Sequence, residues 1–77
     1  MAAMSEMQGV RLLRRRQVEE LVGLGRSSIY ALVAAGKFPA PIHLTARAVA
    51  WLEKEVFEWV ADRVAASRQG PAVEASP

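Results

Sequence analysis

The residues that could do chemistry in this chain are chiefly arginines, serines and one tyrosine. Three arginines stand together at 14–16, and Arg26 is followed directly by Ser27 and Ser28. Guanidinium groups bind phosphate oxygens, and short hydroxyl side chains at the start of a helix contact phosphates or base edges. The pattern predicts contact with a nucleic acid. A solvated basic run at 14–16 is the alternative reading of the same residues.

Catalysis is not predicted, because no nucleophile, base and orienting group occur together. Glu19 and Glu20 are adjacent, so on a helix their side chains diverge by about 100° and do not form an acid/base pair. His43 is the only histidine and the chain has no cysteine, which excludes disulfides and thiolate zinc sites. We expect no enzyme activity, no small-molecule substrate, no metal and no cofactor.

Charge is divided between two parts of the chain. The net charge is only +2, but residues 11–47 hold seven basic against two acidic residues, and residues 53–66 hold four acidic against two basic. A basic region of this kind suits the phosphate backbone of DNA. The acidic region is predicted to form a helix that packs behind the basic one.

The length of 77 residues indicates one small domain. No apolar run approaches the ~20 residues of a membrane span, and the N-terminus has no signal-peptide pattern. We therefore expect a cytoplasmic protein without membrane contact. Residues 1–9 and 67–77 are polar or small and lack periodicity, so we predict a disordered arm and a disordered tail on either side of a domain at 10–66.

Two helices joined by a glycine turn are predicted to position the arginines and serines. Val18, Leu21 and Val22 define the buried stripe of a first helix that ends near Val22, where Gly23 can adopt a positive φ. Gly25 is the predicted N-cap of a second helix, which starts near Arg26 and ends at Gly36. Its Ile29, Leu32 and Val33 should face the core, whereas Ser27, Ala31 and Ala34 should face outward, with Ser28 and Tyr30 flanking. The two serine hydroxyls can also bond the free N–H groups at its start. This is the spacing of a helix-turn-helix.

A hairpin and a last helix complete the predicted domain. Alternating residues at 42–44 and 49–51 predict two short strands around a turn near 45–47, with Arg47 at the tip. Arg47 either reaches DNA or is simply an exposed arginine. The run at 10–13 predicts an edge strand or an extended arm. A helix over 53–66 should bury Val56, Trp59, Val60 and Val64, and leave Phe57 off that stripe.

In order along the chain, the segments GLGRSSIY (23–30), GKFPAP (36–41), RAVAW (47–51) and EVFEW (55–59) resemble the AlpA family of prophage regulators. The resemblance implies a mainly α fold with a small β-hairpin, a winged helix-turn-helix related to MerR-type and excisionase domains. It also implies a DNA-binding transcriptional regulator that promotes integrase expression or excision of a prophage or integrative element. Trp51 and Trp59 correspond to core tryptophans, and Arg47 to the wing arginine. Ala31, Ala34 and Phe57 depart from the family pattern, because relatives often have longer or polar side chains there.

The expected partner is double-stranded DNA. The residues predicted to contact it are Arg14, Arg15, Arg16, Arg26, Ser27, Ser28, Tyr30, Lys37 and Arg47. An architectural excisionase that bends DNA and recruits a recombinase is an alternative function. A protein-interaction adaptor, or self-association, that uses Phe57 and the last helix is another.

Overall fold

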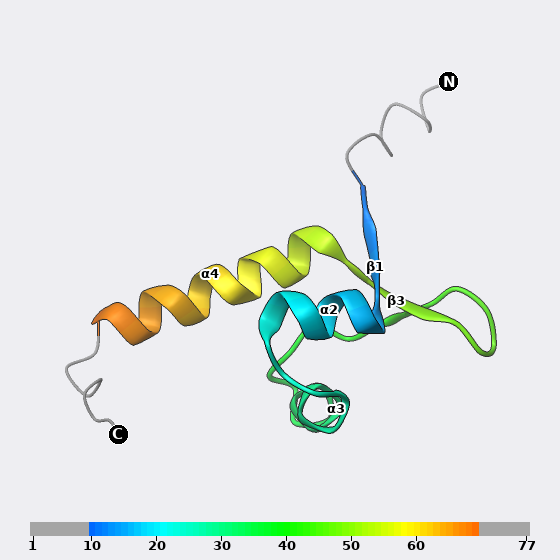
Figure 1. The fold of residues 1–77 in the computed structure, drawn as a ribbon, viewed down its shortest axis with the longest axis horizontal. Coiled ribbons are helices and arrows are strands. Elements are labelled where there is room, and N and C mark those ends of the chain that lie inside the picture. The colour runs from blue at the N-terminus through cyan, green and yellow to red at the C-terminus, as the bar shows by residue number, and fades with distance from the viewer. Residues whose placement is uncertain (1–9, 70–77) are drawn as a thin grey trace.

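The computed structural model describes residues 10–69 and shows three helices and a three-stranded antiparallel sheet (Figure 1). In chain order the elements are β1 (Leu12–Arg14), α2 (Arg15–Val22), α3 (Arg26–Ala34), β2 (Ile42–His43), β3 (Val49–Leu52) and α4 (Glu53–Gln69). The predicted winged helix-turn-helix, mainly helical with a small hairpin, is confirmed. The arm at 1–9 and the tail residues 70–77 lie outside the described residues. None of the helices within 10–69 is long and apolar enough to cross a membrane.

The turn between α2 and α3 is built as its glycines predict. Gly23 ends α2 with φ of 76°, and its N–H donates to the Glu19 carbonyl at 2.8 Å. Gly25 caps α3 in an extended conformation. At the far end of α3, Gly36 has φ of 73°, the Gly36 N–H bonds the Val33 carbonyl, and the next N–H bonds the Leu32 carbonyl. These are the two bonds of a Schellman motif, which closes the helix and reverses the chain.

The strand alternative for residues 10–13 is confirmed, because β1 pairs with β3. The sheet order is β1-β3-β2, so β3 is the central strand, with Leu13 opposite Trp51 and His43 opposite Val49. The hairpin tip has no glycine. Instead, the Thr45 hydroxyl accepts from the N–H groups of Arg47 at 3.2 Å and Ala48 at 3.1 Å. In this turn the hydrogen bonds of the Thr45 side chain therefore take the place of a glycine with positive φ.

The core lies where α2, α3 and α4 meet β3. Val18, Ile29, Trp51 and Val56 are completely buried. Burying an aliphatic side chain such as Val18 or Ile29 contributes about 1.5–3 kcal/mol, so these few residues carry much of the stability of so small a domain. The outward and inward faces predicted for α3 are confirmed, since Ile29 is buried and Ala31 and Ala34 are exposed.

Two tryptophans fasten the loop between α3 and β2. The Trp51 indole N–H donates to the Pro39 carbonyl at 2.8 Å, and the Trp59 indole N–H donates to the Lys37 carbonyl at 2.7 Å. Between these two carbonyls Phe38 is buried, and its ring stands edge-on to Trp59 at 4.8 Å between centroids. The loop is therefore held from β3 and from α4 at once.

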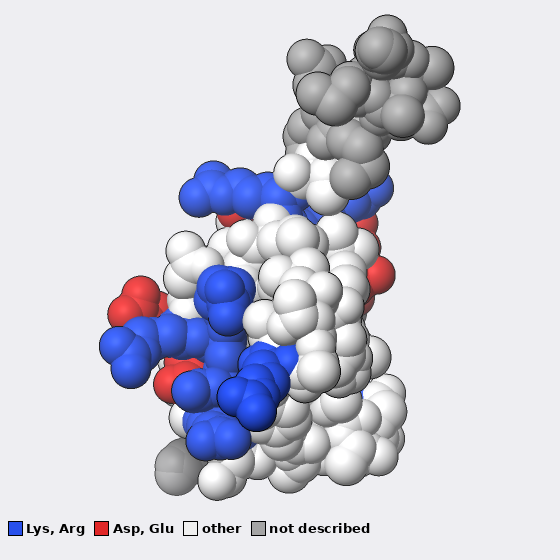
Figure 2. Space-filling model, turned by 90° about the vertical axis from the view of Figure 1, so that its right-hand side faces the viewer, with Lys and Arg blue, Asp and Glu red and all other residues white. Residues whose placement is uncertain are grey.

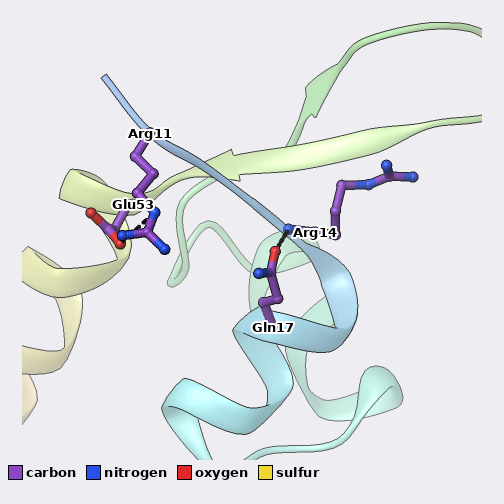
Figure 3. Close-up of polar contacts among 4 residues, drawn as sticks. All are labelled: Arg11, Arg14, Gln17 and Glu53. Atoms are coloured by element: carbon purple, nitrogen blue, oxygen red, sulfur yellow. Dashed lines mark hydrogen bonds and ion pairs between the residues drawn. The ribbon is translucent and has the colours of Figure 1, made fainter. Parts of the chain in front are cut away.

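Helix α4 follows β3 without a linker and is longer than predicted. The Glu53 N–H donates to the Arg11 carbonyl at 2.8 Å, and the two side chains form an ion pair at 3.5 Å (Figure 3). The helix continues to Gln69, so the predicted end at Ala66 is wrong and residues 67–69 are helical rather than part of a disordered tail. The described helix ends just before Gly70 and Pro71, the residue types least suited to a helix.

The predicted core stripe of α4 is only partly buried. Val56 is buried and Trp59 and Val60 are half-buried, but Val64 is 42% exposed. The prediction for Val64 is wrong because α4 extends past the small body formed by the other elements, as Figure 1 shows. Phe57 lies off the stripe as predicted and is 49% exposed.

Candidate nucleic-acid interface

The start of α3 presents one charged and two hydroxyl side chains to solvent. Arg26, Ser27 and Ser28 are all exposed, while Ile29 beneath them is completely buried. The buried residue fixes the rotation of the helix, so the exposed residues keep a constant direction. Neither hydroxyl forms a hydrogen bond with the backbone at the helix start in the part of the chain that is described. The predicted capping by these serines is therefore absent there, and both hydroxyls face solvent.

Residues from three separate parts of the chain line one polar hollow of about 470 Å³, which we call the basic hollow. Its lining consists of Arg14, Arg15, Arg16, Arg26, Tyr30, His43, Ala46, Arg47 and Val49. Five of these nine residues are arginine and none is acidic. Figure 2 shows lysine and arginine side chains gathered on the face of the molecule that bears the hairpin, with acidic side chains at its margins. The hollow is thus a concave surface of positive charge.

The arginine cluster at 14–16 is attached to the sheet and to α2 rather than free along its length. The Arg14 Nε donates to the Val49 carbonyl at 3.2 Å, and the Arg14 N–H donates to the Gln17 Oε1 at 2.8 Å. Figure 3 shows the Arg14 side chain extending away from the Arg11–Glu53 pair. The bond through Nε leaves the terminal guanidinium nitrogens of Arg14 available to a ligand. Because of these two hydrogen bonds, Arg14 is not part of a free, solvated basic run, which was the alternative reading of residues 14–16.

Arg15 differs from its neighbours because it has an acidic partner. Its guanidinium forms an ion pair with Glu19 one turn along α2. Arg15 is half-buried, while Arg14 and Arg16 are exposed. A guanidinium already paired with a carboxylate offers less net charge to a phosphate, so Arg15 should contribute less to anion binding than Arg14 or Arg16.

Tyr30 and Arg47 complete the hollow from α3 and the hairpin. The Tyr30 ring meets the buried Trp51 ring edge-on, with 6.1 Å between centroids, so it is positioned by the core. Arg47 is exposed, and its backbone is held by the Thr45 hydroxyl. These contacts place a half-buried aromatic ring and the tip arginine beside the start of α3.

Lys37 does not belong to this group. It lines a different hollow of about 660 Å³, together with Glu55, Glu58 and Asp62 of α4. The Schellman turn at the end of α3 directs the chain away from the basic hollow, a direction that the residue pattern does not predict. Ser27 and Ser28 also do not line the basic hollow, although they adjoin Arg26 on the exposed side of α3.

Sequence reasoning missed three residues of the lining, namely His43, Ala46 and Val49. His43 is exposed in β2. The signal that could have found it is strand register: His43 pairs with Val49, whose carbonyl receives the Arg14 side chain. Among residues 10–69, no three His, Cys, Asp or Glu side chains lie close enough to hold a metal ion.

Comparison with known proteins places this arrangement in a family. Residues 11–64 match the family described as prophage CP4-57 regulatory protein (AlpA). The chain belongs to the AlpA family. The match begins before β1 and runs into α4, so it includes every residue that lines the basic hollow. The resemblance found from the ordered segments between 23 and 59 is confirmed.

A phage protein is similar to this AlpA-family chain over most of its length. The ORF88 protein of Enterobacteria phage P4, described as uncharacterized, is 45% identical over 60 residues, which cover 78% of this chain and 68% of ORF88. The family description and this relative both connect the chain with phages and prophages. It is therefore related to prophage regulatory proteins.

Proposed function

We propose that this protein binds double-stranded DNA and regulates transcription of prophage or integrative-element genes, promoting integrase expression or excision. The observation that carries the proposal is the basic hollow, where arginines at the β1–α2 junction, at the start of α3 and at the hairpin tip converge. A surface with five arginines and no carboxylate in its lining suits a polyanion. Membership in a family of prophage regulators agrees with this use.

In the proposed complex, α3 enters the major groove with its exposed side toward the base edges. Arg26, Ser27 and Ser28 lie at its start, where a recognition helix meets bases. Ala31 and Ala34 are exposed further along α3, and their methyl groups can pack against the methyl group of thymine. Tyr30 flanks this face of α3.

Phosphate contacts would then come from the other arginines around the basic hollow. Arg14 and Arg16 supply them from the junction of β1 and α2, and Arg47 supplies them from the hairpin tip. Lys37, which was predicted to hold a phosphate, stands in a hollow with three carboxylates and is left out of the proposed interface. Contacts of this kind would fix the orientation of α3 on the duplex and carry no sequence information themselves.

An architectural role is the second candidate, and the short side chains of α3 favour it. Ala31 and Ala34 have no side-chain hydrogen-bonding groups for base edges, so a single copy would have modest sequence specificity. Such a protein would depend on neighbours bound at adjacent sites. A gel-shift series with single, tandem and phased sites separates the roles, because an architectural protein requires the array and a solitary regulator does not.

DNA binding is tested by fluorescence anisotropy with a duplex from upstream of the protein's own coding sequence and with an unrelated duplex. The test variant is Arg26→Ala combined with Arg47→Ala, which removes two cations of the basic hollow. Lys54→Ala is the matched control, because Lys54 is an exposed cation of α4 outside that hollow.

The double variant should lose affinity for both duplexes, and the control should bind like the original protein. Arg26→Ala alone should cost about 1–3 kcal/mol on a specific site if it reads a base, and should weaken all sequences equally if it contacts only phosphate. Equal binding by the double variant and the original protein would refute the proposed surface.

A further inference from the structure

His43 lines the basic hollow from an edge strand of the sheet. Successive residues of a strand point to opposite faces. Ile42 accordingly lines the hollow that contains Lys37, whereas His43 and its partner Val49 line the basic hollow. His43 is exposed, and within residues 10–69 its imidazole forms no hydrogen bond or ion pair. Both ring nitrogens are therefore available to a ligand that enters the hollow.

Within the described residues, the charged side chains that surround His43 in the basic hollow are all cations. Tyr30 of α3 contributes a phenol, and the Glu19 carboxylate, which pairs with Arg15, is not part of the lining. The cations come from the other elements around the hollow: Arg14 from β1, Arg15 and Arg16 from α2, Arg26 from α3, and Arg47 from the hairpin tip. No carboxylate of this lining therefore competes with a phosphate for the imidazole.

His43 is also the side chain of the hollow that can change its charge near neutral pH. Histidine ordinarily gains or loses its charge between about pH 5 and 8, whereas arginine stays charged and tyrosine stays neutral there. The chain has one histidine and no cysteine. A protonated imidazole carries a positive charge and two N–H donors, which suits a phosphate oxygen. Protonation of an imidazole and binding of a phosphate to it therefore favour each other.

We propose that protonated His43 binds a DNA phosphate, so that the protein takes up a proton when it binds DNA. The inference rests on the proposed function and adds a pH dependence to it. A phosphate rather than a base is the expected ligand, because His43 belongs to the hairpin that carries Arg47 and pairs with Val49, whose carbonyl receives Arg14. Arg14 and Arg47 are proposed phosphate contacts, whereas the residues proposed to meet base edges lie on α3.

The coupling between proton uptake and DNA binding fixes the direction of the effect. Because the complex holds more protons than the separate molecules, affinity should rise as the pH falls, by at most about tenfold per pH unit for one proton. One added phosphate contact makes the slope of log affinity against log salt concentration steeper by about 0.9, which corresponds to about eightfold in affinity at about 0.1 M salt. Lowering the pH from about 8 to about 5.5 should produce both changes.

The test is fluorescence anisotropy at constant ionic strength over this pH range, with the duplex from upstream of the coding sequence and with an unrelated duplex. His43→Gln, which stays neutral, should lose the rise in affinity at low pH on both duplexes. His43→Arg, which stays charged, should bind at the upper end of the range about as tightly as the original protein binds at the lower end. Leu44→Gln is the matched control, since Leu44 is 45% exposed and lies outside the hollow, and it should keep the pH dependence.

Proton NMR of the imidazole gives an independent measurement, because a single histidine yields one set of ring signals. The titration midpoint of these signals should move to higher pH when a duplex is added. Circular dichroism checks that every variant keeps its helices. Equal pH dependence in the original protein and His43→Gln, or a midpoint that DNA does not move, would overturn the inference and leave DNA binding intact. Absence of DNA binding at every pH would instead refute the proposed function, and this inference with it.

Discussion

The salt dependence of DNA affinity measures how many cations of the basic hollow neutralise phosphates. Five arginines line the hollow, but Arg15 is paired with Glu19 and Arg26 lies toward the bases in the proposed complex, which leaves Arg14, Arg16 and Arg47. Each neutralised phosphate contributes about −0.9 to the slope of log affinity against log salt concentration, so three contacts give a slope of about −2.7. Between 50 and 200 mM salt, affinity should then fall about 40-fold.

Single substitutions show which residues contribute to this slope, because each lost phosphate contact makes it less steep. Arg47→Ala should bring it to about −1.8, because one phosphate contact is lost. Lys37→Ala and Lys54→Ala should leave it near −2.7, since both lysines lie outside the hollow. The assay is anisotropy titration of one short duplex at five or more salt concentrations. An unchanged slope for Arg47→Ala, or a loss for Lys37→Ala equal to that for Arg47→Ala, would refute the assignment of the interface.

Three further predictions concern stability, measured by urea unfolding followed by circular dichroism. Trp51→Phe should cost about 1–3 kcal/mol, because it leaves the Pro39 carbonyl without its indole donor and creates space in the core. Gly23→Ala should cost about 1 kcal/mol, since an alanine is strained at φ of 76°, whereas Gly25→Ser should stabilise by a few tenths as a better N-cap. Thr45→Val should cost about 1 kcal/mol and speed amide exchange at Arg47, because the hydroxyl bonds at the tip are lost. A Gly23→Ala variant as stable as the original protein, a Gly25→Ser variant less stable than the original, or normal exchange at Arg47 in Thr45→Val would contradict these accounts.

Local chemistry explains which parts of the fold could be predicted. Gly23 and Gly36 were identified as helix ends because positive φ is a property of the residue itself, and both adopt it. The faces of α3 followed from a period of 3.6 residues. Arg26 and Arg47 could be selected because they lie at a helix start and a hairpin tip, where side chains stand clear of the core.

What could not be predicted depends on where the chain runs in space. Lys37 is one residue past a helix end in the sequence, yet the turn directs it toward the acidic side of α4. Val64 continues the apolar period of α4, but periodicity does not reveal that the body of the domain ends before it. The bond from Arg14 to Val49 joins residues 35 apart, and only strand pairing brings them together.

The two indoles that hold the loop between α3 and β2 give the protein an intrinsic optical reporter. One lies in the core against Tyr30 and the other beside Phe38 at the surface of α4. Since they are the only tryptophans in the chain, their fluorescence emission reports on the two hydrogen-bonded contacts of the segment that joins α3 to the hairpin. Replacing either indole isolates the signal of the other, so loosening of the wing can be followed separately from loosening of α4.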